Sequence, residues 1–485
     1  MPVVHRFGKS LVAPAAVAAC LFFVAAPAAA AEPADAAAAA FAPLIAAYDR
    51  AVKPGAEADA YRGQIERVLR RVQRSYALEV DPAPLVAAGV KAIEALAAGR
   101  TETPQPAEVF KRSLNAALAT LDPYSNVLDA GEFKQLSSSL AGTFAGLGLE
   151  IEMANGLVRV VAPMEDSPAA RAGLRRGDLI VKLDDQQVLG MTRADAVARM
   201  RGQPGTPIAL LVRREGLEQD FLVPLVREVI RTRILRWSME GEVLVLRLAQ
   251  FAGSLKPLID AAIAEASAQR QPQGIVLDMR GNPGGSVTQA VAAADAFLTR
   301  GEIVSMRGRT PGNTRSWSAD AAESLPGVPM VVLINGGSAS ASELVAGALQ
   351  DNGRATVTGE RSFGKGSVQT ISSLGEGLGA LRLTTALYYT PSGRSVQRTG
   401  IGPDIELMPP AQATPPRPGR REEDRGQAMP GNSDPKPPKA RVEQALCPRP
   451  AASDDRQLGC ALAFLRAGSL DRFSRNLELG KAPNP

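Results

Sequence analysis

Histidine is almost absent from this sequence, since a single one, His5, stands near the start of the 485-residue chain. That start has the pattern of a removable leader, so the mature protein would carry no imidazole. This excludes Ser-His-Asp and Cys-His catalysis and any metal centre that histidine ligates. No metal and no cofactor are expected, and a hydrolase made from this chain needs another general base. Ser340 and Lys365 are the pair that the sequence offers for such a site.

An excess of charge of one sign is also missing. Lysine and arginine number 55 against 50 acidic residues, a net charge of +5. Without Arg6 and Lys9 of the leader, 53 basic residues remain against 50 acidic ones, a net charge of +3. No basic stripe carries interleaved aromatic residues, so nucleic acid is not an expected partner. An apolar content of 45% and the length of the chain are typical of a soluble protein with two or three domains.

Residues 1–31 have the pattern of a secretory signal peptide. A basic start is followed by an apolar stretch from Leu11 to Val24 and by the small residues Ala28, Ala29 and Ala30. The sequence therefore predicts an exported, periplasmic protein. Lipid anchoring through Cys20 is the less favoured alternative, because the apolar stretch continues beyond this cysteine. A membrane span is disfavoured because the apolar run is short.

Cysteine is scarce as well, and only Cys447 and Cys460 would remain after signal cleavage. In an oxidising compartment these two residues could close a disulfide, whereas two free thiols are an equally good interpretation. The sequence alone leaves this choice open.

Changes of pattern divide the rest of the chain into five segments. Helical spacing of apolar residues marks an amino-terminal region, although its first part, residues 32–60, is weakly patterned. Short strands with two helices indicate a small separate module, and apolar strands alternating with helices predict a largely buried α/β sheet. A stretch rich in proline and charge predicts a disordered linker. In order, the segments are a helical N-terminal region (32–141), the small module (142–227), the α/β core (228–408), the disordered linker (409–441) and a short helical C-terminal extension (442–485).

Two turns in the α/β segment follow buried strands directly. The apolar run 275–279 precedes the turn RGNPGG, and the apolar run 330–334 precedes NGGSASAS. Sites in such sheets form at the carboxyl ends of the strands. We therefore expect both turns to lie at one edge of the sheet.

Ser340 falls at the start of the helix predicted after the second turn. The free N–H groups of a first helical turn and the helix dipole would stabilise a tetrahedral oxyanion there. Spacing alone favours a plainer interpretation, in which Ser340 and Glu343 form a capping box. Ser338 and Ser342 are rival nucleophiles that composition does not exclude.

Lys365 lies in SFGKGSVQ, between Gly364 and Gly366 and next to Phe363. A solvated lysine has a pKa near 10.4, and burial without a carboxylate partner can lower this by several units. The flanking glycines suit a tightly packed, dehydrated approach. For any lysine taken alone, an exposed loop position is the plainer interpretation.

Taken together, these segments resemble the carboxy-terminal processing proteases, the tail-specific serine endopeptidases of the S41 type. No single motif decides the resemblance, but several follow one another in order and at similar spacing. They are LDPYSNVLDAGEFKQL (121–136), GTFAGLGLEI (142–151), SPAARAGLRRGDLI (167–180), DMRGNPGG (278–285), NGGSASASELVAGALQDNGRA (335–355), GERSFGKGSVQ (359–369), LYYTPSGRSVQ (387–397) and GIGPDI (400–405).

The resemblance implies a fold and a set of roles. The fold is a ClpP/crotonase-like α/β protease core with an inserted PDZ domain and a helical N-terminal region. Ser340 would be the nucleophile, Lys365 the general base and Gln369 the residue that holds the lysine. The N–H groups of Ala341 and of Gly284 or Gly285 would form the oxyanion hole, and Asp351 would be structural or supporting. Tyr124 is a departure, since many relatives carry histidine there.

The resemblance also implies partners. The loop of Gly146, Leu147, Gly148 and Leu149 would bind the terminal carboxylate of a peptide, which adds to the PDZ domain as a strand. The expected activity is an exported endopeptidase that cuts near the C-termini of cell-envelope proteins, with the PDZ domain gating the site. An adaptor lipoprotein and a homo-oligomer are compatible with it. The alternative is a catalytically silent PDZ scaffold that binds protein C-termini.

Overall fold

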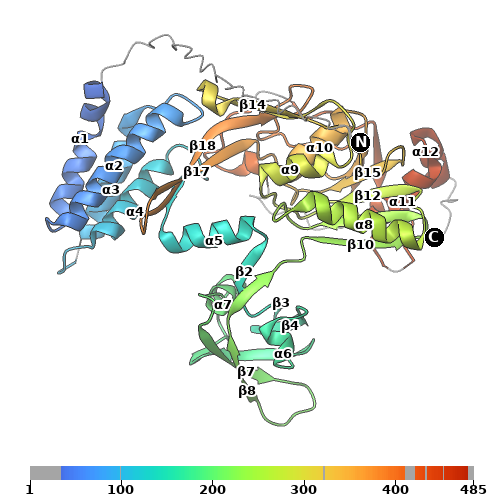
Figure 1. Cartoon of the computed structure of the whole chain (residues 1–485), viewed down its shortest axis with the longest axis horizontal. Coiled ribbons are helices and arrows are strands. Elements are labelled where there is room, and N and C mark those ends of the chain that lie inside the picture. The colour runs from blue at the N-terminus through green and yellow to red at the C-terminus, as the bar shows by residue number, and fades with distance from the viewer. Residues whose placement is uncertain are drawn as a thin grey trace, which may run out of the picture.

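The computed structural model describes residues 34–98, 100–320, 323–409, 421–431, 434–451 and 453–478. The predicted signal peptide and Cys20 lie outside these ranges. Figure 1 shows a helical region at the N-terminal end, a small lobe of strands below, and a larger α/β body that carries the C-terminal helices. Within the described ranges, no helix is both long enough and apolar enough to cross a membrane.

The N-terminal region is built from α1 (Ala34–Ala51), α2 (Ala56–Ser75), α3 (Pro82–Ala97) and α4 (Pro106–Leu118). Their buried faces form one core with Leu381 and Leu383 of a core strand. The weakly patterned residues 32–60, whose order the sequence leaves in doubt, form α1 and the start of α2 over their described part. Phe41, Leu44 and Tyr48 recur at helical spacing and are buried, which gives α1 an apolar face among its many alanines.

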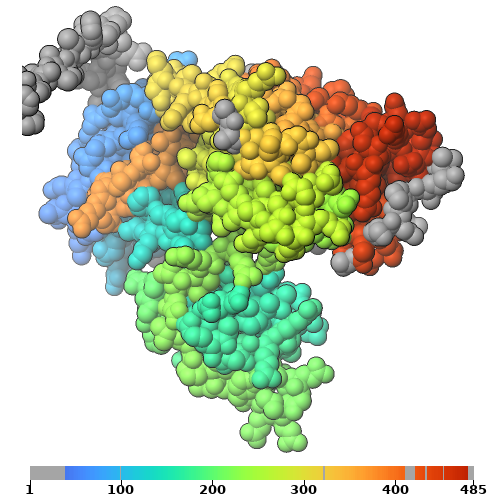
Figure 2. All heavy atoms as spheres, turned by 45° about the vertical axis from the view of Figure 1, so that its right-hand side comes forward, coloured from blue at the N-terminus to red at the C-terminus, as the bar shows by residue number. Residues whose placement is uncertain are grey.

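The small module forms a separate lobe, which projects from the body in Figure 2. It has its own hydrophobic core, so it can fold as a unit. Helix α5 (Ala130–Leu140) leads into it, and the antiparallel pair β2 (Thr143–Gly146) and β9 (Glu228–Arg231) forms its stem. The sheet order is β3 (Leu149–Ala154), β4 (Leu157–Pro163), β5 (Leu179–Leu183), β7 (Pro207–Arg213) and β8 (Phe221–Val226), with β6 (Gln186–Gln187) beside β5 and helices α6 (Pro168–Arg171) and α7 (Arg193–Met200).

The α/β body contains a seven-stranded sheet that is parallel except for its first strand. Its central strands β12 and β15 are fully buried, and they are apolar except for Asp278 at the end of β12. The order is β10 (Leu235–Glu240), β11 (Val243–Leu248), β12 (Gly274–Asp278), β15 (Met330–Ile334), β16 (Thr356–Gly359), β19 (Ile405–Met408) and β20 (Ala440–Glu443), and helices α8 (Leu255–Gln269), α9 (Val287–Asp295) and α10 (Ala341–Asp351) connect its strands.

A second sheet lies between this body and the helical region. Strand β18 (Gly379–Tyr389) contributes to the hydrophobic cores of both regions. Leu381 and Leu383 lie in the core of the helical region, and Ala386 and Tyr388 lie in the core of the body. The other strands are β1 (Asn126–Leu128), β13 (Glu302–Gly308), β14 (Arg315–Ser318), which follows the short helix η1 (Pro311–Asn313), and β17 (Ser367–Gly375), which pairs with β18.

The predicted disordered linker is wrong over its described part. Residues 421–431 pack against the body, where the side chain of Glu422 is completely buried, and β20 extends the parallel sheet. Composition indicated disorder because the stretch is rich in proline and charge, whereas its partners are distant in sequence. The C-terminal elements are η2 (Glu422–Asp424), η3 (Gln444–Leu446), α11 (Arg456–Ala467) and α12 (Leu470–Glu478).

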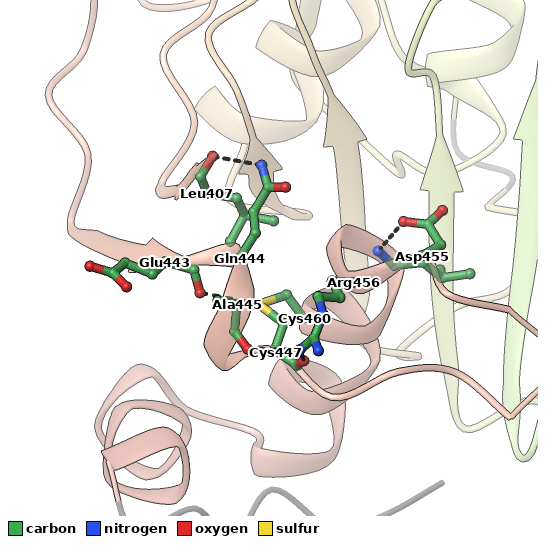
Figure 3. The surroundings of a disulfide bond; sticks show 9 residues. Leu407, Glu443, Gln444, Ala445, Cys447, Asp455, Arg456 and Cys460 are labelled. Carbon is green, nitrogen blue, oxygen red and sulfur yellow. Dashed lines mark hydrogen bonds between the residues drawn. A yellow bond between two sulfur atoms is a disulfide. The ribbon is translucent and has the colours of Figure 1, made fainter. Parts of the chain in front are cut away.

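A disulfide joins Cys447 and Cys460, whose Cα atoms are 4.9 Å apart. This resolves the choice that the sequence leaves open. Figure 3 shows the bond between the end of η3 and helix α11, beside the Arg456 side chain, which donates to the carbonyl oxygen of Cys447 at 2.8 Å. The bond fixes α11 over the sheet, where Leu458 and Leu462 are buried against β11, β12 and β15.

Candidate active site

The candidate site lies at the carboxyl ends of three neighbouring parallel strands. Strands β12, β15 and β16 are hydrogen-bonded side by side. The turn after β12 and the loop after β15 therefore meet at one edge, as the strand–turn pattern predicts. The loop after β16, residues 360–366, brings Lys365 to the same edge.

Ser340 occupies a strained turn between β15 and α10. Its φ of 55° and ψ of −114° lie in a region that residues with a side chain rarely adopt. The Glu343 N–H donates to the backbone carbonyl of Ser340 at 2.8 Å, and the serine side chain makes no capping hydrogen bond. Only the reverse half of the predicted capping box forms, from the Ser340 N–H to the Glu343 carboxylate at 2.7 Å. The hydroxyl is therefore left available for chemistry.

The two rival serines have structural roles. Ser338 is fully buried, accepts from the Asn335 N–H at 3.0 Å and donates to the Met279 carbonyl at 2.8 Å. Ser342 is fully buried and donates to the Asn282 carbonyl at 2.8 Å. Both hydroxyls join the loop after β15 to the segment that follows β12, so neither is free to attack a substrate.

Backbone N–H groups surround Ser340. A side chain on Gly284 would lie 2.9 Å from the Cβ atom of Ser340, so only glycine permits this close approach. The Gly284 N–H, however, donates to the Asn282 side chain at 2.9 Å. Within the described ranges, no acceptor is recorded for the N–H groups of Ala341 and Gly285. These two are therefore the better candidates for an oxyanion hole, and Gly284 serves the close approach instead.

Two glycines hold the Lys365 loop against a neighbouring segment. A side chain on Gly364 would meet the Arg398 backbone at 2.8 Å, and one on Gly366 would meet the Gln397 nitrogen at 2.6 Å. The Phe363 N–H donates to the Ser338 carbonyl at 3.0 Å, which joins this loop to the serine loop. The tightly packed approach predicted from the glycines is present.

The amine of Lys365 is withdrawn from water although the residue as a whole is only half-buried. Burial, followed by the positive charge of Arg382, lowers the pKa of Lys365 to about 8. The amine lies 3.8 Å from the ring centre of Tyr124. Within the part of the chain that the structure describes, no carboxylate forms an ion pair with it. At pH 7.4 such a lysine is neutral about one time in five, against about one in a thousand for a solvated lysine.

Glu343 is the residue that sequence reasoning undervalued. Its fully buried carboxylate accepts four hydrogen bonds. Burial raises its pKa to about 7, although the four hydrogen bonds act to lower it. One oxygen accepts from the Ser340 N–H at 2.7 Å and from the Lys365 N–H at 2.9 Å. The two backbone nitrogens therefore lie within about 6 Å of each other. The other oxygen accepts from the Ser362 hydroxyl at 2.6 Å and the Gly364 N–H at 2.7 Å.

Within the described residues, no hydrogen bond joins Gln369 to the lysine amine. Its amide nitrogen donates to the hydroxyls of Ser367, at 3.0 Å, and Thr384, at 3.2 Å. Residues four apart are neighbours on a helix, but in extended backbone they are about 13 Å apart. Gln369 stands on β17, where the pairing register also shifts between Val368 and Gln369.

Asp351 is structural. It ends α10, at the far end of the helix from Ser340. Its carboxylate accepts from the Ser392 hydroxyl at 2.7 Å and pairs with Arg394 at 2.6 Å. Burial alone would raise its pKa, but hydrogen bonds and Arg394 outweigh burial and lower it. Asp351 thus anchors the loop after β18.

The loop predicted to bind a carboxylate borders a cleft of about 1000 Å³. Strand β3 is the edge strand of the small sheet, and its free edge is available for an added strand. A side chain on Gly148, whose φ is +72°, would clash with Ser167 at 2.2 Å, which explains the glycine. The cleft is lined by Gly146, Leu147, Gly148 and Leu149 together with Phe144, Val197, Met200 and Ile230.

A serine on a strained strand-to-helix turn, whose backbone shares a buried carboxylate with the loop of a dehydrated lysine, suits a serine hydrolase. Comparison with known proteins agrees: residues 242–407 match the model of peptidase family S41 and residues 159–214 that of the PDZ domain. The chain belongs to the carboxy-terminal-processing proteases of family S41 and is a serine peptidase with a PDZ domain.

Individual relatives show how far the similarity extends. A carboxy-terminal-processing protease of Bartonella bacilliformis is 47% identical over 310 residues, which cover 63% of this chain and 71% of the relative. A probable CtpA-like serine protease of Staphylococcus epidermidis is 33% identical over 291 residues, 60% of this chain and 58% of that one. The solved photosystem II D1 C-terminal processing protease is 28% identical and covers 73% of this chain and 94% of its own, with a TM-score of 0.45.

Proposed function

We propose that this protein is an exported serine endopeptidase that uses a Ser340–Lys365 dyad to cut cell-envelope proteins near their C-termini. One observation carries the proposal. The strained serine and the dehydrated lysine are tied to the same buried carboxylate of Glu343 through their backbone N–H groups. The predicted signal peptide and the disulfide between Cys447 and Cys460 support export to an oxidising compartment.

The proposed chemistry needs only groups of this chain. The neutral Lys365 amine takes the proton of the Ser340 hydroxyl while the oxygen attacks the peptide carbonyl. The N–H groups of Ala341 and Gly285 stabilise the negative oxygen that develops. The lysine then gives the proton to the leaving amine, and an acyl-enzyme remains. Water then attacks this ester while the lysine takes its proton, and the lysine returns the proton to the departing Ser340 oxygen.

We expect a fluorophosphonate probe to label the full-length protein at Ser340 alone. Of the three candidate serines after β15, this is the one whose hydroxyl is not held by a hydrogen bond to a backbone carbonyl. Peptide mapping of the labelled protein measures the position. Ser338→Ala and Ser342→Ala remove the two rival hydroxyls and should retain the label, whereas Ser340→Ala should abolish it. Absence of labelling across pH 6 to 10 would instead support the catalytically silent PDZ scaffold.

The PDZ domain is proposed to bind the free C-terminus of the substrate. Gly146 and Glu228 face each other across the β2–β9 ladder, so residues 147–227 can be replaced by a two-residue Asn-Gly turn without moving the stem. The intact protein should cleave a peptide with a free terminal carboxylate about tenfold to a hundredfold faster than its amidated form. The shortened protein should cleave both at similar rates. A preference that survives the excision would contradict this role and the proposed gating.

A further inference from the structure

The segment 421–431, within the stretch predicted to be a disordered linker, reaches the Lys365 loop. Three contacts hold residues 421 and 422 there. The Glu422 N–H donates to the Phe363 carbonyl at 3.0 Å, and the Arg421 side chain donates to the Ser362 carbonyl at 3.1 Å. The third runs through Gln397, whose amide donates to the Glu422 carboxylate at 3.1 Å and accepts from the Gly366 N–H at 2.9 Å. The family model ends at residue 407, so it does not account for these contacts.

Glu422 also binds the residue that covers the lysine amine. The Tyr124 hydroxyl donates to its other carboxylate oxygen. The ring of Tyr124 stands over the Lys365 amine at 3.8 Å, and the Arg425 guanidinium lies 5.4 Å from the same ring. Glu422 is fully buried, although a carboxylate is rarely found so without a partner. Its two oxygens bind Tyr124 and Gln397, the two groups that border the lysine, and the Arg425 guanidinium lies 4.0 Å from the oxygen that binds Tyr124.

We propose that Glu422 is a positioning residue for Lys365: through Tyr124 and Gln397, it holds an aromatic ring on the lysine amine and closes the lysine pocket to water. The inference rests on the proposed Ser340–Lys365 dyad. It assigns to the segment 421–431 a part of the active site.

Several charges face the amine and set the sign of the expected effects. Arg382 of β18 and Arg425 of the segment 421–431 favour the neutral amine, whereas Glu422 and Asp122 favour the ammonium form. Removing the charge of Glu422 while keeping its shape should therefore make the lysine easier to deprotonate. Removing the whole side chain should release Tyr124 and admit water, which moves the lysine toward the pKa near 10.4 of a solvated amine.

The test is the pH dependence of the rate at which a fluorophosphonate probe labels Ser340 in the full-length protein. The acid limb of this profile should follow the deprotonation of Lys365. Glu422→Gln should move the limb about half a unit to one unit to lower pH. Glu422→Ala should move it at least one unit to higher pH. Glu423→Gln is the matched control, because Glu423 stands on the same turn, is exposed and pairs with Arg361 away from the amine.

Opposite shifts from Glu422→Gln and Glu422→Ala, with none from Glu423→Gln, would support the proposal. A merely structural Glu422 would lower the melting temperature and the amount of labelled protein but leave the limb in place, and this result would overturn the proposal. If a Lys365→Ala variant labels as fast as the wild-type protein, the dyad itself fails. An intact dyad with an unmoved limb in both Glu422 variants would refute this inference alone.

Discussion

Replacing Lys365 by methionine should abolish peptide cleavage and at the same time stabilise the protein. The general base is lost, so we expect kcat/KM for an unstructured polypeptide to fall at least about 10³-fold. The pKa of Lys365, about 8 in the folded protein, is below its ordinary value of 10.5 because the amine is buried. Below pH 8 both states hold the proton, so folding buries a charged amine, and the difference in pKa corresponds to about 3 kcal/mol of lost stability.

The sign of the pH dependence follows from this difference. The folded state binds fewer protons than the unfolded state between pH 8 and 10.5, so the stability of the wild-type protein should rise across this window. The methionine variant should lack this rise and have a higher melting temperature than the wild type at pH 7. Lys134→Met, at an exposed position on α5, is the control and should change neither activity nor stability. A Lys365→Met variant that melts lower than the wild type at pH 7 would contradict a dehydrated amine.

Replacing Glu343 by glutamine should lower both the stability of the protein and the reactivity of Ser340. Each of its oxygens accepts two hydrogen bonds, so either orientation of the amide in Glu343→Gln turns an NH₂ group toward two donors. Buried donors without acceptors cost about 1–3 kcal/mol each. We expect the variant to lose about 2–5 kcal/mol of stability. Labelling of Ser340 should be at least about 100-fold slower, because the serine and lysine loops lose their shared anchor.

The control for this effect is a buried polar side chain on the neighbouring strand β16. The Thr358 hydroxyl on β16 is buried and has no hydrogen-bond partner within the described residues, so Thr358→Val should be tolerated without loss of labelling. Thermal denaturation and labelling rates measure both variants. Wild-type labelling by Glu343→Gln would show that the carboxylate does not hold the two loops together.

Strand and helix positions of the core could be predicted from local patterns. The five apolar residues of β15 and the helix that follows them stand where the sequence predicts. Such runs can be recognised in a sequence because a parallel strand buried on both faces is nearly all apolar, whichever strand it pairs with. Helix α1 was harder to predict, since alanine fills both its faces and only Phe41, Leu44 and Tyr48 mark the buried one.

Polar contacts between distant residues could not be predicted in the same way. Nothing near Glu422 distinguishes it from the charged residues around it, and its partners Tyr124 and Gln397 lie 298 and 25 residues away. The resemblance implies that Gln369 holds the lysine, whereas its amide nitrogen binds the hydroxyls of Ser367 and Thr384. The sequence suggested Glu343 only as a capping residue. Its carboxylate also holds the Lys365 loop through the N–H groups of Gly364 and Lys365.

By itself, the sequence determined the parallel strands, the turns at their carboxyl ends and the glycines that let these turns approach one another. It also determined the chemical types present, a serine and a lysine in a chain almost without histidine. Only the tertiary structure decided which serine keeps a free hydroxyl, which carboxylate joins the two loops and what covers the lysine amine. The reason is physical: apolar burial follows the periodicity of neighbouring residues, whereas a buried polar group is fixed by partners that folding brings from elsewhere in the chain.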